Sequence, residues 1–425
     1  MSLPVVGFAG MTHLGINTAA ATAARGFRTL GFDPDAALVA RLAAGRLPIV
    51  EPGLDDLVAA NADRLGFTAD AGDLKACDVV YIAADVPTDD DAKSDLAPIR
   101  ALIDAVAPHL GPDAVLVVLC QVPPGFTRAL TSVPHPRLVY QVETLIFGRA
   151  VERAMHPERF IVGLADPSRG LPPVLGTVLE AFACPILPMR YESAELAKIS
   201  INFCLVASVS VANTLAELSE AIGADWSEIT PALKLDKRIG PFAYLAPGLG
   251  ISGGNLERDL RTVIDIARDR RTHVGVVEAW LDNSQWRKDW PWRTLKAAVL
   301  DGDPKARIAV LGLAYKENTH STKNSPALVL LEHLTGNDVA VHDPVVPASV
   351  VPWARGCASA MEAVAGADAV VIATPWPDYR GLKADDLAAV MRGRVVIDPY
   401  RMLDGAAARS AGLSWFCLGA PAAAG

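Results

Sequence analysis

Cysteine is scarce in this chain of 425 residues, and its six thiols are scattered, with no CxxC pair and no metal-ligand spacing. This pattern argues against a metal site and predicts free thiols in a reducing cytoplasm, most of them filling the core. We interpret the acidic run Asp89–Asp91 as a solvated loop rather than a set of ligands. The cysteines are Cys77, Cys120, Cys184, Cys204, Cys357 and Cys417.

Clusters of basic residues are also lacking, and the formal net charge is −9. This balance argues against a nucleic-acid or membrane partner. No uninterrupted apolar run reaches the length of a bilayer span, and the N-terminus shows neither the basic region nor the cleavage site of a signal peptide. Instead, 51% hydrophobic and 20% charged residues predict a globular cytoplasmic protein of two or three domains.

The chain opens with a strand, a glycine turn, a helix and a second strand. The apolar run 4–10 precedes a helix expected at 15–25, and the strand at 29–32 ends in Asp33. Dinucleotide-binding folds show this order, with the acid bonding the ribose hydroxyls. We therefore predict dinucleotide binding over a plain strand–helix–strand turn, and Asp33 favours NAD because a carboxylate would repel the 2′-phosphate of NADP.

The glycine fingerprint of this turn is incomplete. Gly10 and Gly15 hold its first and third glycine positions, but Thr12 holds the second. That position is where the backbone comes closest to phosphate, so Thr12 weakens the fingerprint. Alternatively, the Thr12 hydroxyl donates a hydrogen bond to a phosphate oxygen.

Further apolar runs alternate with helical patterns and predict a mostly parallel sheet covered by helices on both faces. Strands are expected at 79–83 and 115–119, and another begins at 139–141. Proline-containing loops at 84–93 and 121–126 follow the carboxyl ends of two strands. Ligands of doubly wound sheets bind at such ends.

The stretch 190–222 lacks proline and glycine and predicts a long, largely buried helix that Gly223 ends. Glu195, Lys198 and Asn202 fall on one face of it, at offsets of three and four. A buried lysine needs a partner or a chemical role. The alternative is a Glu195–Lys198 surface pair.

The segment 238–259 contains five glycines among aromatic and apolar residues. Such glycine density marks backbone in special conformations close to a ligand. We favour a binding loop over a flexible linker, because Phe242, Tyr244 and Leu249 are not typical of a solvated linker.

The second half echoes the first, with VVGFAG matched by IAVLGL and DVVYIAADVP by DAVVIATPWP. The fold class is therefore α/β, with two Rossmann-like parallel sheets joined by the long helix and a small helical dimerisation domain. The expected domains are 1–189, 190–300 and 301–425, and the tail 420–425 is expected to be disordered.

Seven motifs follow one another along nearly the whole chain. They are GxxxxG at Gly10–Gly15, PIVEPGL at 48–54, ETLIFGRAVERAMHPERFIVG at 143–163, AELAKISIN at 194–202, RIGPFAYLAPGLG at 238–250, GLAYKENTHSTKNSPAL at 312–328 and HDP at 342–344. In this order they resemble the UDP-glucose/GDP-mannose dehydrogenase family. The resemblance implies an NAD domain, a central helical dimerisation domain and a nucleotide-sugar-binding domain, assembled as a homodimer.

The resemblance also implies a chemistry. Family members oxidise the C6 alcohol of a sugar to a carboxylate in two hydride transfers to NAD, and hold the intermediate aldehyde as a thiohemiacetal on a cysteine. Glu143 matches the glutamate that activates water, and Lys198 and Asn202 match the residues that stabilise alkoxide and oxyanion. Asp259 matches the acid after the cysteine loop. The substrate contacts implied are Arg238, which reaches the neighbouring subunit's substrate, Tyr244, Gly250 and Lys316.

This sequence departs from the family pattern at several positions. Asn255 stands where the cysteine is expected, and Gln121 where a threonine orders water. Lys323 stands where the family has an arginine that contacts phosphate or cofactor. Arg258 stands where the family has a lysine. An amide is not a nucleophile of the required kind, so the thiohemiacetal route is closed unless a cysteine enters from elsewhere.

Three functions remain open from the sequence. The first is an NAD-dependent nucleotide-sugar dehydrogenase altered in its second oxidation, in which Asn255 and Gln121 bond a hydroxyl or an aldehyde hydrate. The second is an epimerase- or dehydratase-like enzyme that retains NAD. The third is a non-catalytic nucleotide-sugar-binding homologue, which has little use for Glu143, Lys198, Asn202 and Asp259 together.

Overall fold

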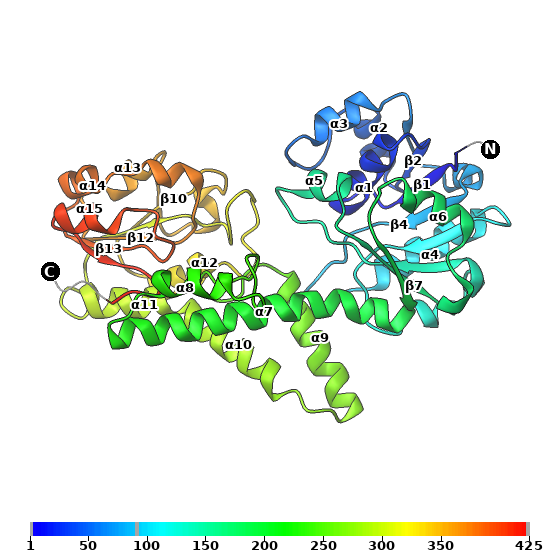
Figure 1. Cartoon of the computed structure of the whole chain (residues 1–425). Helices are drawn as coiled ribbons and strands as arrows, with labels where there is room; N and C mark the ends of the chain where they lie inside the picture. Colours follow the sequence, from blue (N-terminus) through cyan, green and yellow to red (C-terminus); the bar gives the residue numbers. More distant parts are fainter. Residues whose placement is uncertain (1–2, 90–92, 422–425) are drawn as a thin grey trace. The chain divides into compact units, whose positions relative to one another are not determined.

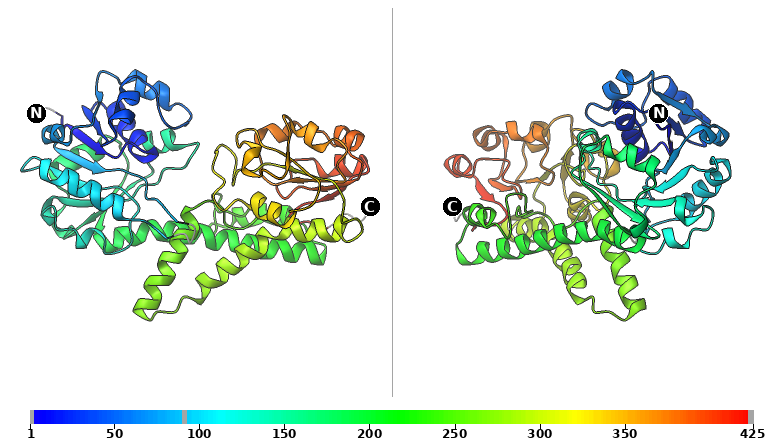
Figure 2. Two further views of the ribbon diagram at one scale, coloured as in Figure 1. Left: turned by 180° about the vertical axis from the view of Figure 1, so that it is seen from behind. Right: turned by 45° about the vertical axis from the view of Figure 1, so that its right-hand side comes forward.

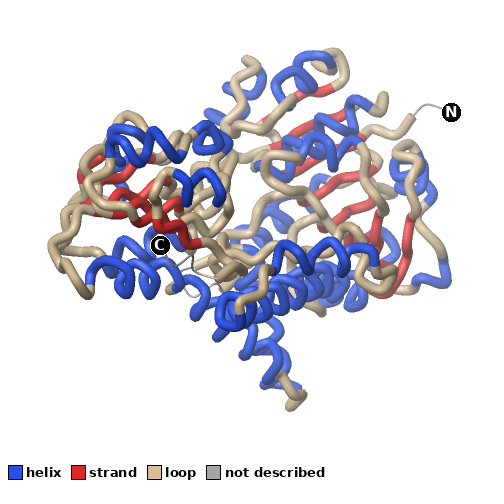
Figure 3. The backbone as a smooth tube through the Cα atoms, turned by 60° about the vertical axis from the view of Figure 1, so that its left-hand side comes forward, coloured by secondary structure: helices blue, strands red, loops and turns tan. Residues whose placement is uncertain are grey.

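The computed structural model describes residues 3–89 and 93–421 and divides into two compact units, Met1–Ile201 and Asn202–Gly425. In each unit, helices cover both faces of a sheet (Figures 1 and 3). The predicted α/β class is thus confirmed. Asp90 and Asp91 of the predicted acidic loop, and residues 422–425 of the predicted disordered tail, lie outside the described residues.

The first unit is built on an eight-stranded sheet of order β3-β2-β1-β4-β5-β6-β7-β8. Neighbouring strands are parallel except β6 and β7, which are antiparallel. The order reverses direction between β1 and β4, which is where open α/β sheets bind ligands. The strands are β1 (Val6–Ala9), β2 (Thr29–Phe32), β3 (Leu65–Thr68), β4 (Val79–Ile82), β5 (Val115–Val118), β6 (Leu138–Gln141), β7 (Phe160–Leu164) and β8 (Ile186–Arg190).

Alternation along the central strands divides the core of this unit into two layers. Val79 and Tyr81 of β4 belong to the apolar cluster on one face of the sheet, and Val80 and Ile82 belong to the cluster on the other. Because both faces are buried, these strands are continuously apolar, as parallel strands are expected to be. The helices that cover them are α1 (His13–Ala24), α2 (Ala36–Ala43), α3 (Leu54–Ala60), α4 (Ala97–Val106), α5 (Ala150–Met155) and α6 (Pro173–Glu180).

The second unit contains a six-stranded, all-parallel sheet of order β11-β10-β9-β12-β13-β14. The strand order β11-β10-β9 repeats the order β3-β2-β1 of the first sheet. The two halves that are similar in sequence are therefore also similar in topology. At the turn after β9, Gly312 donates to His342, as Gly10 after β1 donates to Phe32. The strands are β9 (Ile308–Leu311), β10 (Val339–His342), β11 (Arg355–Gly356), β12 (Ala369–Ile372), β13 (Val395–Ile397) and β14 (Ser414–Phe416).

Helices of the second unit pack on this sheet and form a helical hairpin from α9 and α10, shown from two sides in Figure 2. Predicted elements agree with the observed ones to within about two residues at each end. The helices are α8 (Trp226–Leu235), α9 (Asn255–Arg270), α10 (Gly275–Lys288), α11 (Trp290–Leu295), α12 (Pro326–His333), α13 (Ala360–Val364), α14 (Ala384–Val390) and α15 (Gly405–Ser410), with a π-helical turn at Lys296–Leu300.

The long helix predicted at 190–222 is α7 (Tyr191–Ile222). Its predicted burial is wrong, because only a third of its most apolar stretch is buried within the chain. By length and composition α7 would pass as a membrane span, but the core helices of soluble proteins pass the same test, so a single case is a weak indication. An apolar stripe stays exposed instead, at Val211, Leu215, Leu218 and Ile222.

Candidate functional site

The turn between β1 and α1 requires glycine at the two predicted positions. Gly10 has φ +95°, and a Cβ there would lie 2.7 Å from Cβ of Ala84. A Cβ on Gly15 would lie 1.9 Å from the carbonyl oxygen of Gly10. The first turn of α1 therefore packs directly on the glycine turn, which leaves a cradle that any side chain would fill.

Asp33 follows β2 and is only partly engaged. Its Oδ2 accepts from the Met11 amide at 2.8 Å and its Oδ1 from the Asp35 amide at 3.0 Å. Each oxygen keeps acceptor capacity, so the carboxylate fits the ribose hydroxyls of an adenosine. The cradle and this acid together fit NAD, which would be held at Gly10, Gly15 and Asp33 and would supply the hydride acceptor.

The corresponding acid of the second sheet, Asp343, is fully engaged. Amides of Leu313, Ala314, Val345 and Val346 donate to it, together with the indole of Trp376. Burial raises the pKa of Asp343, but these backbone hydrogen bonds outweigh it and hold the pKa below its usual value. This acid stabilises the fold, so the second glycine turn lacks the open acceptor that a ribose needs.

The Thr12 hydroxyl is engaged by the neighbouring loop. Its Oγ1 accepts from the Asp85 amide at 2.9 Å and lies 3.5 Å from the Ala83 carbonyl oxygen. Thr12 is the N-cap of α1 but makes no side-chain cap bond. The predicted donation from Thr12 to phosphate stays a prediction.

His13, in the first turn of α1, and Glu51, in the segment before α3, are two buried residues that were not predicted from the sequence. Nε2 of His13 lies 3.0 Å from Oε2 of Glu51, and Phe147 stacks on the imidazole with ring centroids 4.0 Å apart. Glu51 also accepts from the amides of Gly148 and Ala150. The pair thus fastens the segment after Glu143 to the cofactor turn. The only sequence signal for it was the PIVEPGL motif.

Glu143 and Lys198 form an ion pair in the first unit. Nζ of Lys198 on α7 lies 2.9 Å from Oε1 of Glu143, and the two side chains are 12% and 16% exposed. Oε2 of Glu143 accepts from the Leu145 amide at 2.9 Å. A nearly buried ammonium and carboxylate are thus placed together at the end of β6, as the resemblance implies.

Gln121 lies at the same level of the sheet as Glu143. The register pairs Val118 of β5 with Tyr140 of β6, and Gln121 and Glu143 each follow three residues later. Because parallel strands end at one edge, the amide and the carboxylate belong to one row at the carboxyl edge of the sheet.

Glu195 is not the partner of Lys198. Its fully buried carboxyl group accepts from the amides of Gly125 at 2.6 Å and Thr127 at 2.8 Å. The alternative of a Glu195–Lys198 surface pair is therefore wrong. Burial raises the pKa of Glu195, and the residue fixes α7 to the loop after β5.

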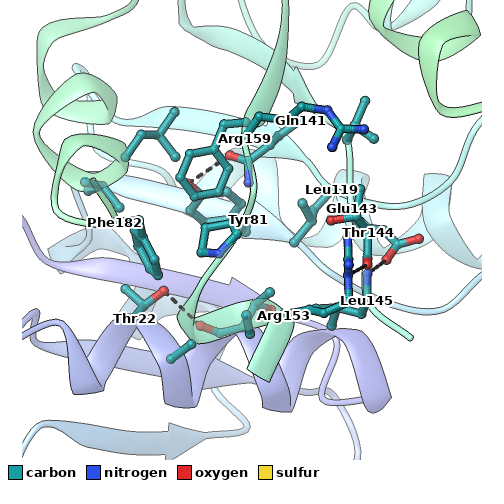
Figure 4. Close-up of a pocket in the computed structure, with 18 of the residues that line it drawn as sticks. Thr22, Tyr81, Leu119, Gln141, Glu143, Thr144, Leu145, Arg153, Arg159 and Phe182 are labelled. Carbon is teal, nitrogen blue, oxygen red and sulfur yellow. Dashed lines mark hydrogen bonds between the residues drawn. The ribbon is translucent and has the colours of Figure 1, made fainter. Parts of the chain in front are cut away.

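A small cavity of about 60 Å³ lies beside Glu143 in the first unit. Figure 4 shows Tyr81 and Gln141 pointing toward each other, with Tyr81 Oη 3.4 Å from Oε1 of Gln141. Glu143 and Leu145 line another part of the wall. The segment that carries Glu143 therefore borders a cavity on one side, and Lys198 and the Leu145 amide help to hold Glu143 in place.

In the second unit, Asn202 of α7 donates through Nδ2 to Oδ2 of Asp259 at 2.5 Å. Both side chains are buried, and Nε of Arg258 lies 3.6 Å from Oδ1 of Asp259. Lys198 and Asn202 are four residues apart on one helix and so share a face, as predicted. Asn255 is exposed in the first turn of α9.

The loop before Asn255 is rigidly held, which agrees with a built loop rather than a linker. Gly250 has φ +73°, and a Cβ there would lie 2.3 Å from the Ser284 carbonyl oxygen. The Ile251 amide donates to Oγ of Ser284 at 2.7 Å. Lys288, which the sequence reading missed, is buried and bonds Asn324, which in turn donates to Glu257 at 2.7 Å. Burial lowers the pKa of Lys288.

The remaining predicted substrate and cofactor residues lie around this loop or in solvent. The carbonyl oxygen of Lys323 accepts from the Gly253 amide at 3.1 Å, and Nζ of Lys316 lies 5.7 Å from the centre of the Tyr315 ring. Arg238 extends into solvent and pairs with Asp236 at 2.6 Å, and Tyr244 is half exposed. Their contacts with substrate stay predictions. No cluster of His, Cys, Asp or Glu suited to a metal occurs in residues 3–89 and 93–421.

Comparisons with known proteins agree with this geometry. Of the UDP-glucose/GDP-mannose dehydrogenase family, the NAD-binding domain model matches residues 4–181, the central domain model 192–285, and the UDP-binding domain model 309–405. The UDP-glucose 6-dehydrogenase AglM of Haloferax volcanii is 31% identical, with 93% of this chain and 96% of that protein covered. The UDP-glucose 6-dehydrogenase TuaD of Bacillus subtilis is 28% identical, with 98% and 93% covered.

Among solved structures, a UDP-glucose dehydrogenase from the hyperthermophilic archaeon Pyrobaculum islandicum matches with a TM-score of 0.86 at 28% identity, over 98% of this chain and 97% of that one. The match spans both sheets and α7. With its NAD-binding and UDP-binding domains, the chain belongs to the UDP-glucose/GDP-mannose dehydrogenase family and is an NAD-dependent nucleotide-sugar dehydrogenase.

Proposed function

We propose that this enzyme oxidises the C6 alcohol of a nucleotide-sugar, as a UDP-glucose 6-dehydrogenase does, and that it forms no thiohemiacetal, so that its second oxidation is altered. The observation that carries the proposal is the ion pair of Lys198 and Glu143, 2.9 Å long and largely shielded from water. Removing two charges from water costs free energy, so a shielded ion pair of this kind points to a functional role for its charges.

In the first oxidation the alcohol gives up a hydride and a proton. The Lys198 ammonium stabilises the alkoxide that forms as the proton leaves, and Asn202 donates a second hydrogen bond to the same oxygen. A water held by Asp259 accepts the proton. Each such contribution is typically worth about 10²–10⁴ in rate.

Five of the six cysteines have thiols whose pKa is raised by burial, so they are unsuited to hold the aldehyde. Burial raises the pKa of Cys77 and Cys417 to about 12, and also raises the pKa of Cys184 and Cys357. Cys120, next to Gln121, is buried with its thiol donating to the Ile82 carbonyl oxygen. The remaining thiol, Cys204, is exposed on α7. An attacking thiolate requires a lowered pKa, which is the opposite of what burial does to the other five thiols.

The second oxidation then runs through the hydrate, or not at all. Glu143 accepts a proton from the water that adds to the aldehyde and returns it to the former carbonyl oxygen, which gives a geminal diol. The Gln121 amide, at the same edge of the sheet as Glu143, bonds one hydroxyl group of the diol. The diol loses a hydride and a proton to give the acid, so no covalent bond to the enzyme forms or breaks.

We also propose that the enzyme acts in the cytoplasm and that two copies of the chain assemble. The exposed stripe of α7 repeats at spacings of four, three and four residues, which is the pattern of a helix that packs on another helix. Exposed apolar surface of this kind marks an interface. We therefore expect a homodimer formed through α7.

The test is the NADH yield of purified enzyme with UDP-, GDP-, CDP- and TDP-sugars. One NADH per sugar means that oxidation stops at the aldehyde, and two with unmodified protein by mass spectrometry mean the hydrate route. A cysteine adduct would contradict the proposal, and so would zero NADH with every sugar.

An Asn255→Cys variant tests the position directly. A thiol in the first turn of α9 gains thiolate character from the helix N-terminus, so this variant should accumulate an aldehyde adduct at residue 255. Asn255→Ser is the matched control and should form none. If neither variant forms an adduct, residue 255 does not lie next to the carbon that reacts.

A further inference from the structure

One buried carboxylate, that of Glu51, joins the cofactor turn to the segment that carries Glu143. Its side chain is fully enclosed by the protein. Oε2 accepts from Nε2 of His13 at 3.0 Å and from the Gly148 amide at 3.1 Å, and Oε1 accepts from the Ala150 amide at 2.8 Å. Three donors from two separate stretches of the chain therefore converge on one side chain.

The first of these donors belongs to the helix that follows the glycine turn. His13 lies in the first turn of α1, three residues after Gly10, and is 7% exposed. Because a carboxylate only accepts hydrogen bonds, Nε2 of His13 carries the proton that the two side chains share. Phe147 stacks on the imidazole with ring centroids 4.0 Å apart, so the ring is held between Glu51 and Phe147. The turn that would hold NAD is thus fixed to Glu51.

The other two donors lie at the far end of the Glu143 segment. The Leu145 amide donates back to Oε2 of Glu143 at 2.9 Å, and the Arg149 amide donates to the Ile146 carbonyl oxygen at 2.9 Å. Arg149, the N-cap residue of α5, makes no side-chain cap bond, and Glu51 accepts the first amide of this helix in its place. A displacement at this end is therefore passed back to Glu143 through two hydrogen-bonded turns instead of being absorbed by a loose loop.

We propose that Glu51 is a positioning residue for the oxidation, which sets the distance between the cofactor turn and the Glu143 carboxylate. The inference rests on the proposed function, in which Glu143 takes a proton from the water that adds to the aldehyde. Because its side chain is enclosed, Glu51 acts through the groups that it bonds and not on the substrate. A catalytic group displaced by about 1 Å can lose about 10²-fold in rate, so this distance matters for turnover.

Glu51→Gln breaks this arrangement with almost no change in size. The Gly148 and Ala150 amides bond different oxygens of the carboxylate, and a glutamine side chain has only one oxygen. In either orientation of the glutamine, one backbone N–H therefore faces its NH₂ group. We expect the rate per NADH-binding site to fall about 10–100-fold, while the dissociation constant for NAD changes less than about threefold because the cofactor cradle is untouched.

A double-mutant cycle tests whether Glu51 acts through Glu143. The four proteins are full-length wild type, Glu51→Gln, Glu143→Gln and the double variant. Each is mixed in excess with the fastest substrate among UDP-, GDP-, CDP- and TDP-sugars, and NADH formation from NAD is followed to completion, so that each oxidation has its own rate. Glu51→Gln should slow the same step as Glu143→Gln, and the double variant should be no slower than Glu143→Gln alone.

The outcomes separate this inference from the proposed function. Rate losses that multiply in the double variant would overturn the positioning role of Glu51, and so would a Glu51→Gln enzyme as fast as wild type, while the role of Glu143 would stand. If Glu143→Gln slows neither oxidation, or if no sugar yields NADH, the proposed function fails and this inference fails with it. A purely structural Glu51 would lower the melting temperature and the number of NADH-binding sites but leave the rate per site unchanged.

Glu152→Gln is the matched control, because Glu152 is an exposed acid on α5 whose Oε1 lies 2.7 Å from Nη2 of Arg149, and it should behave as wild type. If Glu51→Gln does not fold, His13→Phe takes its place in the cycle, since it keeps a ring beside Phe147 and removes one donor to Glu51. It should slow the same step about two- to tenfold, because the two backbone hydrogen bonds remain. Losses that multiply with Glu143→Gln would overturn the proposal here too.

Discussion

Nζ of Lys198 lies 2.9 Å from Oε1 of Glu143, and neither side chain has more than a sixth of its surface exposed. The lysine comes from α7 and the glutamate from the end of β6, 55 positions apart in the sequence. Removing one partner of such a pair leaves the other charged and poorly solvated, which is more damaging than losing a surface pair.

We expect Lys198→Ala to lower turnover by about 10²–10⁴ while the dissociation constant for NAD changes less than about threefold, since the cofactor cradle is elsewhere on the sheet. Steady-state rates and a direct NADH-binding titration check both parts. Lys296→Ala is the control, because Lys296 pairs with Asp301 at the surface. Unchanged turnover in Lys198→Ala would remove this lysine from the mechanism.

The two acids after β2 and β10 should respond to substitution in opposite ways. Asp33→Asn should weaken NAD binding about tenfold or more and leave the free energy of unfolding within about 0.5 kcal/mol. Asp343→Asn should leave NAD affinity unchanged and cost about 2 kcal/mol, because an amide accepts fewer of the five N–H groups. Calorimetric NAD titration and denaturant unfolding measure the two effects.

The loss at Asp343 should also depend on pH. Its pKa in the folded state is held below the ordinary value of 3.8, so its ionised form contributes stability that is fully present above that value. The contribution fades as pH falls through the lower folded pKa. The gap in unfolding free energy between wild type and Asp343→Asn should therefore be constant near neutrality and shrink below about pH 4. A gap that widens there would contradict this role.

Gly15→Ala should abolish NAD binding or folding of the first unit, because the new Cβ would lie 1.9 Å from a backbone oxygen that cannot move aside. Gly176→Ala is the contrasting variant. Its Cβ on α6 meets nothing within 4 Å, so we expect about 0.5–1 kcal/mol of stabilisation. Thermal melting and NADH binding of both variants provide the measurement.

Leu218→Glu should convert the homodimer that we propose to a species of 44.8 kDa, since it places a charge in the middle of the exposed stripe of α7. Leu235→Glu is the control, because Leu235 is 84% exposed at the end of α8 and outside the stripe. Sedimentation at several concentrations distinguishes the two. A wild type that stays monomeric at micromolar concentration would refute α7 as a dimer interface.

The fold was largely predictable because its strands are short apolar runs between recognisable turns. Hydrophobic periodicity and turn residues such as glycine and proline locate the elements well, and both ends of β2 are predicted to the residue. Burial of α7 was not predictable in the same way. A helix that is apolar on every face indicates burial against something, but the pattern does not say whether that is the same chain or a second copy.

Candidate site residues could be named from the sequence where a motif carries them, but their hydrogen-bond partners could not be predicted where tertiary packing decides the pairing. Lys198 and Glu143 follow from the resemblance, whereas the pairing of Glu195 with two amides requires knowing that α7 packs on the loop after β5. Asp85 lay in a loop that the sequence marked only as proline-containing. Its position beside Thr12 follows from strand register, and no local pattern reveals register in a parallel sheet.

The saturated carboxylate of Asp343 has a consequence for engineering. Because five donors already hold it, converting the second glycine turn into a working adenosine receptor would require removing some of those donors, Trp376 first, at the expense of thermal stability. Single substitutions in this turn therefore cannot supply an open acceptor without also removing hydrogen bonds that hold the second sheet together.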